Sequence, residues 1–298
     1  MKKFTPKGTF TALVTPFKKS GEIDFNTLQL LIEFQAENGI DGIVVCGSTG
    51  ESATLTEKEK IAVIDQSVKF ANGKIHIIAG TGTYETEATR NFTIIAKELG
   101  ASAALIVAPY YNKPTQDGLF EHYAISVKDA NMPIIIYNIP GRTGVNISVD
   151  TQLKLAATFP NIVATKEASG NLDQIMNIIS KAPEHFSVLS GDDQFTLPMM
   201  AIGAKGVISV ITNYAPKKFS EMVALALKGK FIDAAKIHYE LYELMKLNVI
   251  ETNPIPVKAA MAMMGMIKEM IRMPLLTLTK DNSKLMKDAL ISAGFLNK

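Results

Sequence analysis

The chain has one cysteine, no tryptophan and four histidines among its 298 residues. Because Cys46 has no second cysteine to pair with, an internal disulfide is excluded, and a reducing cytoplasm is the expected location. His76, His122, His185 and His238 are scattered along the chain and lack the spacing of metal ligands. We therefore expect no metal site.

Long apolar runs and a strong charge of one sign are also missing. No run is long enough to cross a bilayer, and the basic start of the chain is not followed by the apolar segment of a signal peptide. The 31 basic and 29 acidic residues give a net charge of +2, and short basic clusters lie within helical patterns as solvated surface. We therefore expect neither a membrane nor a nucleic-acid partner.

Eight short apolar runs alternate with amphipathic stretches, at the spacing of about 30 residues that is typical of β-α-β units. Most of these runs are continuous rather than alternating, which is typical of parallel strands buried on both faces. They cover residues 10–14, 42–46, 75–79, 103–108, 133–137, 162–165, 186–189 and 206–211.

Helix signals separate the apolar runs. Thr56 and Glu59 have the spacing of a capping box at the start of a helix. Further helix starts are expected at Asp24, Ser148, Asn171 and Pro216. One helix should carry its apolar stripe on Ala88, Phe92, Ile95 and Leu99.

Eight strand–helix units with short connections predict a closed (β/α)8 TIM barrel rather than an open, doubly wound sheet. Neither a dinucleotide-binding glycine pattern nor a Walker loop is present. Residues 1–214 are expected to form the barrel strands and helices. Residues 215–298 should form the last barrel helix and a C-terminal helical extension, packed as one domain with the barrel. This tail is expected to be helical throughout, apart from a break at residues 253–256.

Lys166 stands at the end of the sixth run, and barrel enzymes carry their chemistry at the C-terminal ends of the strands. Burying an ammonium is costly unless the group is paired or loses its proton. A neutral lysine amine is a nucleophile that can attack a ketone and form an imine. A structural ion pair with Glu167 or another carboxylate is the alternative, and the residue alone favours neither interpretation.

Other strand ends carry polar groups that suit this chemistry. Tyr137 ends the neighbouring run, where its hydroxyl can carry a proton, although strand tyrosines often serve only packing. The Gly-Ser-Thr-Gly turn containing Ser48 and Thr49 can bind a carboxylate or a phosphate, although such clusters are most often plain turns. Arg142 can bind a carboxylate bidentately, although a solvated loop arginine is commoner.

Three motifs at strand ends together resemble the pyruvate-dependent Schiff-base aldolases of the dihydrodipicolinate synthase and N-acetylneuraminate lyase group. They are Gly-Ser-Thr-Gly-Glu at residues 47–51, Tyr-Asn-Ile-Pro at 137–140 and Lys-Glu-Ala at 166–168, and the resemblance covers nearly the whole chain. Residues 109–114 and 142–144 resemble the dihydrodipicolinate synthase branch, in which the arginine receives the carboxylate of the aldehyde substrate.

This resemblance implies a Schiff-base aldol reaction. Lys166 would condense with pyruvate, and the resulting enamine would attack L-aspartate 4-semialdehyde, after which the adduct cyclises and releases the lysine. The product would enter the diaminopimelate route to lysine. Tyr137, Ser48 and Tyr111 would form a proton relay, with Tyr111 reaching in from a neighbouring subunit.

The resemblance also implies binding residues and an assembly. Ser48 and Thr49 would hold the pyruvate carboxylate, Arg142 would bind the aldehyde substrate, and Gly191 and Ile208 would line the pocket. Neither a cofactor nor a metal is implied. The expected assembly is a homotetramer built as a dimer of dimers.

The chain departs from the group's usual pattern at two places. The relay position often carries threonine, and Ser48 keeps the hydroxyl. In lysine-inhibited enzymes an asparagine and a glutamate bind the inhibitor, and the matching positions here are Tyr84 and Ala88. Without that carboxylate the inhibitor's ammonium loses its charged partner, which predicts weak or absent inhibition by L-lysine.

Two alternatives remain at this stage. One is an N-acetylneuraminate lyase or another pyruvate-dependent 2-keto-3-deoxy-acid aldolase, and Arg142 argues against it because a sugar offers no carboxylate at that end. The other is a non-catalytic barrel that binds a 2-oxo acid, and the combination of Lys166, Tyr137, Ser48 and Tyr111 argues against that.

Overall fold

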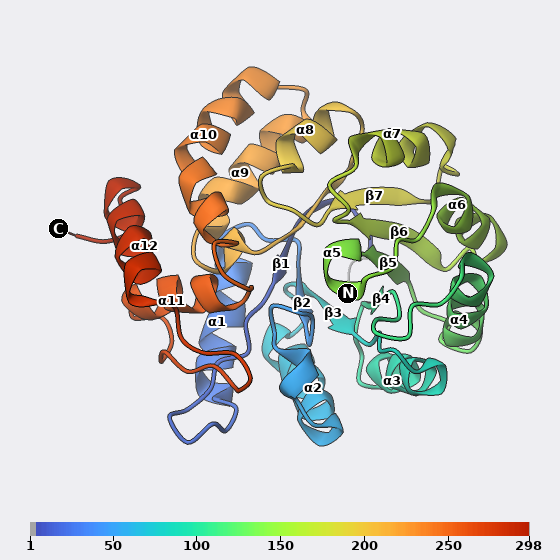
Figure 1. Ribbon diagram of the computed structural model, residues 1–298, viewed down its shortest axis with the longest axis horizontal. Helices are drawn as coiled ribbons and strands as arrows, with labels where there is room; N and C mark the ends of the chain where they lie inside the picture. The colour runs from blue at the N-terminus through green and yellow to red at the C-terminus, as the bar shows by residue number, and fades with distance from the viewer. Residues whose placement is uncertain (1–3, 298) are drawn as a thin grey trace.

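The computed structural model describes residues 4–297 and shows a closed barrel of eight parallel strands (Figure 1). Each strand pairs with the next along the chain, and β8 pairs with β1 to close the ring. The predicted TIM barrel is therefore confirmed. The strands are β1 (Gly8–Ala12), β2 (Gly42–Val45), β3 (His76–Gly80), β4 (Ala103–Val107), β5 (Ile134–Asn138), β6 (Ile162–Glu167), β7 (Ser187–Ser190) and β8 (Gly206–Ser209).

Helices surround the barrel, and α12 lies at the outer edge of the molecule, packed against α10 and α11 (Figure 1). Within residues 4–297, none of the helices combines the length and the apolar character that a bilayer span needs. The α-helices are α1 (Phe25–Glu37), α2 (Glu57–Ala71), α3 (Thr86–Glu98), α4 (Gln116–Lys128), α5 (Pro140–Thr143), α6 (Val149–Thr158), α7 (Leu172–Lys181), α8 (Thr196–Ala201), α9 (Pro216–Leu227), α10 (Phe231–Leu247), α11 (Ile255–Met263) and α12 (Lys280–Ser292), and the short 3₁₀ helices are η1 (Ser52–Thr54) and η2 (Ile211–Asn213).

The residues expected to begin helices do so. In the capping box, Thr56 Oγ1 accepts a hydrogen bond from Glu59 N at 3.3 Å, and Glu59 Oε2 accepts one from Thr56 N at 2.9 Å. The side chains of Asp24, Ser148 and Asn171 each accept a hydrogen bond from a backbone N–H three residues later. These caps satisfy N–H groups that have no partner within the helix.

The strands end one or two residues away from the ends of the expected runs, and two of these differences bear on the site. β6 extends to Glu167, so Lys166 lies inside the strand rather than after it. β2 ends at Val45, and Cys46 leaves the sheet with a left-handed φ of 56°. Lys166, expected at the end of a buried parallel strand, is therefore held within β6 by its pairing with the neighbouring strands.

The eighth strand is shorter than predicted and ends at Ser209. The carboxylate of Asp193 accepts hydrogen bonds from Val210 N at 3.1 Å and from Ile211 N at 2.8 Å. Because these N–H groups bond to a side chain instead of a neighbouring strand, the chain turns into η2.

Helix α3 buries a different face from the expected apolar stripe. The fully buried positions are Thr89, Thr93 and Ala96, and the stripe itself is only partly covered. Thr93 Oγ1 donates to the Thr89 carbonyl at 2.7 Å and bonds to Thr81 Oγ1 at 2.9 Å. Threonine can take these core positions because its hydroxyl finds partners there.

The tail is not helical throughout. In addition to the expected break before α11, residues 264–279 contain no helix. Gly265 leaves α11 in the left-handed conformation, with φ of 73°. Further along this segment, Arg272 N donates to the Glu51 carboxylate at 3.0 Å, far from its own part of the chain.

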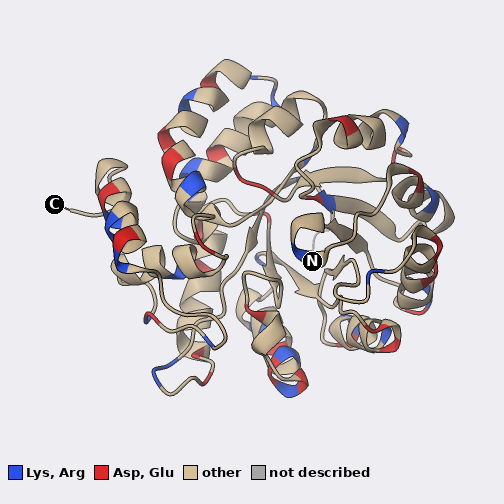
Figure 2. Ribbon diagram, viewed as in Figure 1, with Lys and Arg blue, Asp and Glu red and all other residues tan. Residues whose placement is uncertain are grey.

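A separate apolar cluster fills the interior of the barrel. It contains Phe10, Val44, Ile135, Leu189 and Ile208, together with the ring of Tyr137. Charged residues of both signs are interspersed on the outer helices, as Figure 2 shows. The inside of the barrel is therefore a packed core that opens only at the ends of the strands.

Candidate active site

Lys166 and Tyr137 lie side by side on neighbouring strands. They are partners in the register of β6 and β5, and both side chains are about 5% exposed. The ammonium nitrogen of Lys166 is 4.1 Å from the centre of the Tyr137 ring. This geometry places a buried amine against the face of an aromatic ring, next to a group that can carry protons.

The expected alternative, an ion pair between Lys166 and Glu167, is wrong. Neighbouring residues of a strand point to opposite faces, and the Glu167 carboxylate accepts hydrogen bonds from Asn138 Nδ2 at 2.7 Å, Gln174 Nε2 at 2.9 Å and Gln152 Nε2 at 3.3 Å. Burial raises the pKa of Glu167, and these amide donors act in the opposite direction. Within residues 4–297, no carboxylate forms an ion pair with Lys166.

Gly191 lies against the Lys166 side chain. A Cβ atom at this position would lie 3.1 Å from Lys166 Cε and 2.7 Å from the Cβ of Ala168. A larger residue would therefore push the lysine out of place. Ile208 is fully buried in the same interior cluster as Tyr137, whereas Gly191 follows the end of β7 and is half-buried.

The turn after β2 carries Ser48 and Thr49. Ser48 is half-buried and Thr49 is buried. Gly50 N donates to Gly47 O at 3.1 Å, and Glu51 N donates to Ser48 O at 3.1 Å, so the segment folds tightly on itself. Two hydroxyl groups are thus presented by one compact turn.

Ser48 lines a cavity of about 300 Å³ at the mouth of the barrel. One wall residue, Val107, is the register partner of Tyr137, which in turn pairs with Lys166. The cavity wall therefore includes a residue of β4, which is separated only by β5 from the strand that carries the amine. It is lined by Ser48, Glu51, Ser52, Ala53, Thr54, Lys60, Gly82, Val107, Tyr110, Ile139, Arg142, Thr143, Thr252, Asn253, Pro254, Pro274 and Leu275.

Arg142 lies in α5 and lines the same cavity as the Ser48 turn, and Asn253 connects these two segments. Asn253 Nδ2 donates to Thr49 Oγ1 at 2.9 Å, and the Asn253 carbonyl accepts from Arg142 Nη2 at 3.0 Å. The guanidinium remains exposed apart from this bond. Three segments distant in sequence therefore meet at one edge of the cavity.

The structure brings Tyr110, rather than Tyr111, to the cavity. Tyr111 is 92% exposed, has a left-handed φ of 71° and does not line the cavity. Tyr110 is half-buried, lines the cavity and packs edge-on against Tyr84 with ring centres 5.4 Å apart. Within one chain, Tyr111 is thus not assembled with Lys166.

Sequence reasoning missed Asn253 and Tyr110. The Asn-Pro-Ile-Pro segment predicts a helix break, and its polar residue just before the first proline is a signal that could indicate a role for Asn253. A larger hollow of about 560 Å³ lies between α10 and α12 and contains none of the predicted site residues.

A metal site and a reactive thiol are not indicated in the described part of the chain. Residues 4–297 hold no group of three histidine, cysteine or acidic side chains that could bind a metal ion. Burial raises the pKa of the Cys46 thiol to about 12, so it remains protonated at neutral pH.

The family model described as the dihydrodipicolinate synthetase family matches residues 5–293. The chain belongs to this family. Over 283 residues it is 51% identical to the 4-hydroxy-tetrahydrodipicolinate synthase of Hydrogenobaculum sp.. This alignment covers 95% of this chain and 97% of the relative.

Solved structures of the dihydrodipicolinate synthetase family have the same fold. The enzyme from Aquifex aeolicus is 51% identical with a TM-score of 0.96, covering 98% of this chain and 100% of that one. The chloride-inhibited enzyme from Acinetobacter baumannii, described as complexed with pyruvate, is 42% identical with a TM-score of 0.96 and covers 98% and 100%.

Proposed function

We propose that the chain condenses pyruvate with L-aspartate 4-semialdehyde, acting as a 4-hydroxy-tetrahydrodipicolinate synthase. The observation that carries this proposal is Lys166, a buried amine on β6 that forms no ion pair within the described residues and lies 4.1 Å from the ring of Tyr137. The family membership and the named relatives support the same reaction.

The Lys166 amine attacks C2 of pyruvate, and loss of water leaves an imine. Removal of a proton from the pyruvate methyl group gives an enamine, whose carbon attacks the aldehyde carbon of the second substrate. The amino group of that substrate then attacks C2 of the former pyruvate, closes the ring and releases the lysine. Tyr137 is placed to carry protons in these steps, with Ser48 as the next hydroxyl.

Thr49 and Arg142 are the proposed carboxylate-binding groups. Because Thr49 Oγ1 accepts a hydrogen bond from Asn253, its own hydrogen is available to donate to the pyruvate carboxylate. Arg142 holds the carbonyl of Asn253 with one nitrogen and keeps other donors free for the carboxylate of the semialdehyde. Gly191 and Ile208 complete the pocket around the amine.

We propose that Tyr111 serves the site of a second copy of the chain. Its 92% exposure leaves the ring available for contact with another subunit. A homotetramer made of two such dimers remains the predicted assembly, and a cytoplasmic location remains a prediction. The proposed chemistry uses a covalent lysine imine and calls for no metal or cofactor.

Pyruvate consumption by the purified protein tests the function, with L-aspartate 4-semialdehyde and N-acetylmannosamine offered in parallel. We expect turnover only with the semialdehyde, lost in Lys166→Ala and strongly reduced in Arg142→Ala. Borohydride with pyruvate should add the mass of a reduced adduct at Lys166. Turnover only with the amino sugar would place the chain among the sialic-acid lyases, and the absence of both turnover and adduct would leave a non-catalytic barrel.

A further inference from the structure

Glu51 closes the turn that carries Ser48 and Thr49, and its carboxylate is buried. Its Oε1 accepts a hydrogen bond from Lys258 Nζ at 2.5 Å, and its Oε2 accepts one from Arg272 N at 3.0 Å. The residue has a left-handed φ of 56°, a conformation that most side chains avoid. A carboxylate at this strained position is therefore held by two segments more than 200 residues later in the chain.

Lys258 is the buried cation of this contact. Besides Glu51, its ammonium donates to the Thr15 carbonyl at 2.9 Å and lies 4.3 Å from the centre of the Phe17 ring. Thr15 Oγ1 in turn donates to Gly50 O at 2.7 Å. Through Thr15 and Glu51, the one lysine secures two successive residues of the turn.

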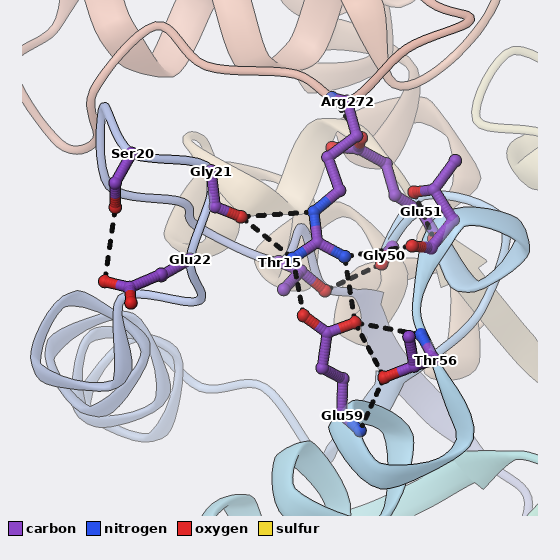
Figure 3. A network of polar contacts seen from close by, with 10 residues as sticks. Thr15, Ser20, Gly21, Glu22, Gly50, Glu51, Thr56, Glu59 and Arg272 are labelled. Atoms are coloured by element: carbon purple, nitrogen blue, oxygen red, sulfur yellow. Dashed lines mark hydrogen bonds and ion pairs between the residues drawn. The ribbon is translucent and has the colours of Figure 1, made fainter.

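Arg272 holds the next part of the same loop, as Figure 3 shows. Its guanidinium donates to Glu59 Oε1 at 2.5 Å, to the Thr54 carbonyl at 2.9 Å and to the Gly21 carbonyl at 2.8 Å. It also lies 4.5 Å from the centre of the Phe17 ring. The non-helical segment of the tail thus fixes the loop that continues from the turn into α2.

The turn has few contacts of its own that could set the direction of its hydroxyl groups. Its internal hydrogen bonds join residues three to five positions apart, and the other anchors of Thr49, Gly50 and Glu51 come from Asn253, Thr15, Lys258 and Arg272. Disturbing a buried ion pair costs more free energy than disturbing an exposed one, because water cannot replace the lost interaction. The orientation of the turn therefore depends on the tail.

We infer that Glu51 and Lys258 are positioning residues for pyruvate, whose ion pair aims the Ser48 and Thr49 hydroxyls at the pyruvate carboxylate. This inference rests on the proposed function. Neither residue touches the substrate, and each acts through the turn. Disturbing the pair should weaken the capture of pyruvate while Lys166 itself remains able to form the imine.

The test is borohydride trapping over a range of pyruvate concentrations, read by mass spectrometry at Lys166. In the double variant Glu51→Gln/Lys258→Met, which leaves no unpaired buried charge, the half-saturating pyruvate concentration should rise about 10- to 100-fold. The adduct formed at saturating pyruvate should stay as in the wild type. A merely structural role would lower the melting temperature and leave the half-saturating concentration unchanged.

Lys218→Met is the matched control, because Lys218 forms a 3.0 Å ion pair with Glu240 on the exposed faces of α9 and α10. It should keep the wild-type pyruvate dependence. If the double variant does not fold, the single variant Glu51→Gln, which keeps the shape of the side chain, can be tested in the same way. Its half-saturating pyruvate concentration should also rise, but by less. A folded Glu51 variant with wild-type half-saturation would overturn the inference, whereas a wild-type chain without any adduct would overturn the proposed function and the inference with it.

Discussion

Two regions of the molecule each bury a lysine, and the two lysines differ in whether they form an ion pair. At the mouth of the barrel Lys166 is 5% exposed, and at the junction of the tail with the β2–α2 loop Lys258 is 2% exposed. Each ammonium lies over an aromatic ring, Tyr137 at 4.1 Å and Phe17 at 4.3 Å. Only Lys258 has a carboxylate partner, Glu51 at 2.5 Å.

The difference shows that burial alone does not mark a nucleophile. Burial lowers the pKa of Lys258, but the Glu51 carboxylate opposes that shift and keeps the cation in a structural role. Among the described residues Lys166 forms no ion pair, although its charge lowers the pKa of the Asp192 carboxyl, against the larger effect of burial. The candidate site thus differs from the ion pair of Lys258 in two respects. Within the described residues Lys166 forms no ion pair, and it lies beside Tyr137, which can carry protons.

Lys166→Met should give the largest effect in this comparison. Turnover of pyruvate should fall at least about 10³-fold, because the covalent intermediate can no longer form. The melting temperature should stay near that of the wild type or rise, since an unpaired buried amine is replaced by an apolar side chain. Pyruvate consumption and calorimetry check the two parts, and a variant with more than a tenth of the activity would contradict the role of this lysine.

Tyr137→Phe should lower kcat about 10²-fold, the range expected for loss of one proton carrier. The ring that packs against Lys166 remains, so thermal stability should change little. Steady-state kinetics at saturating substrates measure the effect. An unchanged kcat would assign Tyr137 to packing alone.

Lys258→Met should have the opposite pattern from Lys166→Met. It leaves the buried Glu51 carboxylate unpaired, which should cost about 3–5 kcal/mol of unfolding free energy. Adding Glu51→Gln should recover most of that loss, because the unpaired charge is removed as well. Urea unfolding of the three variants provides the measurement, and equal stability of the single and double variants would show that the pair is not coupled.

Glu59→Gln should weaken the acid sensitivity of the tail junction. The hydrogen bond from Arg272 lowers the pKa of Glu59 from 4.5 to about 2. A depressed carboxyl pKa stabilises the fold above the unfolded value, and the contribution is lost as the pH falls from 4.5 towards 2. For this partly exposed pair we expect about 1 kcal/mol. Unfolding at pH 6 and pH 3 should show a smaller difference in the variant than in the wild type.

Free L-lysine should have the smallest effect. Its ammonium would need a charged partner like the one that Glu51 provides to Lys258, and the expected position holds Ala88 beside the exposed Tyr84. We therefore expect little loss of activity at 1 mM lysine, on the order of a tenth or less. A lysine titration of the initial rate measures this, and half-inhibition below that concentration would show that another group replaces the missing carboxylate.

The sequence allowed the barrel and much of the site to be predicted because both depend on local patterns. Continuous apolar runs mark buried parallel strands, and cap residues mark helix starts, as at Thr56 and Glu59. The order of the strands alone places Tyr137 beside Lys166, because consecutive strands pair in a barrel. These conclusions need no knowledge of contacts between distant segments.

The remaining features depend on contacts that local patterns do not contain. The amide groups around Glu167 come from three different elements, and the bonds of Asn253 and Lys258 to the 49–51 turn span more than 200 residues. The non-helical segment 264–279 is fixed by the bonds of Arg272 to distant partners, not by its own residue preferences. Such partners can be identified only once the chain is folded.

The late position of Lys258 in the chain sets an order of events during synthesis. All eight strands have been made once Ser209 is added, whereas Lys258 follows about 50 residues later. At 5–20 residues per second, that interval lasts roughly 2–10 s on the ribosome. The nascent chain therefore contains every strand of the barrel, and its amine, for several seconds before the segment that anchors the pyruvate turn has been translated.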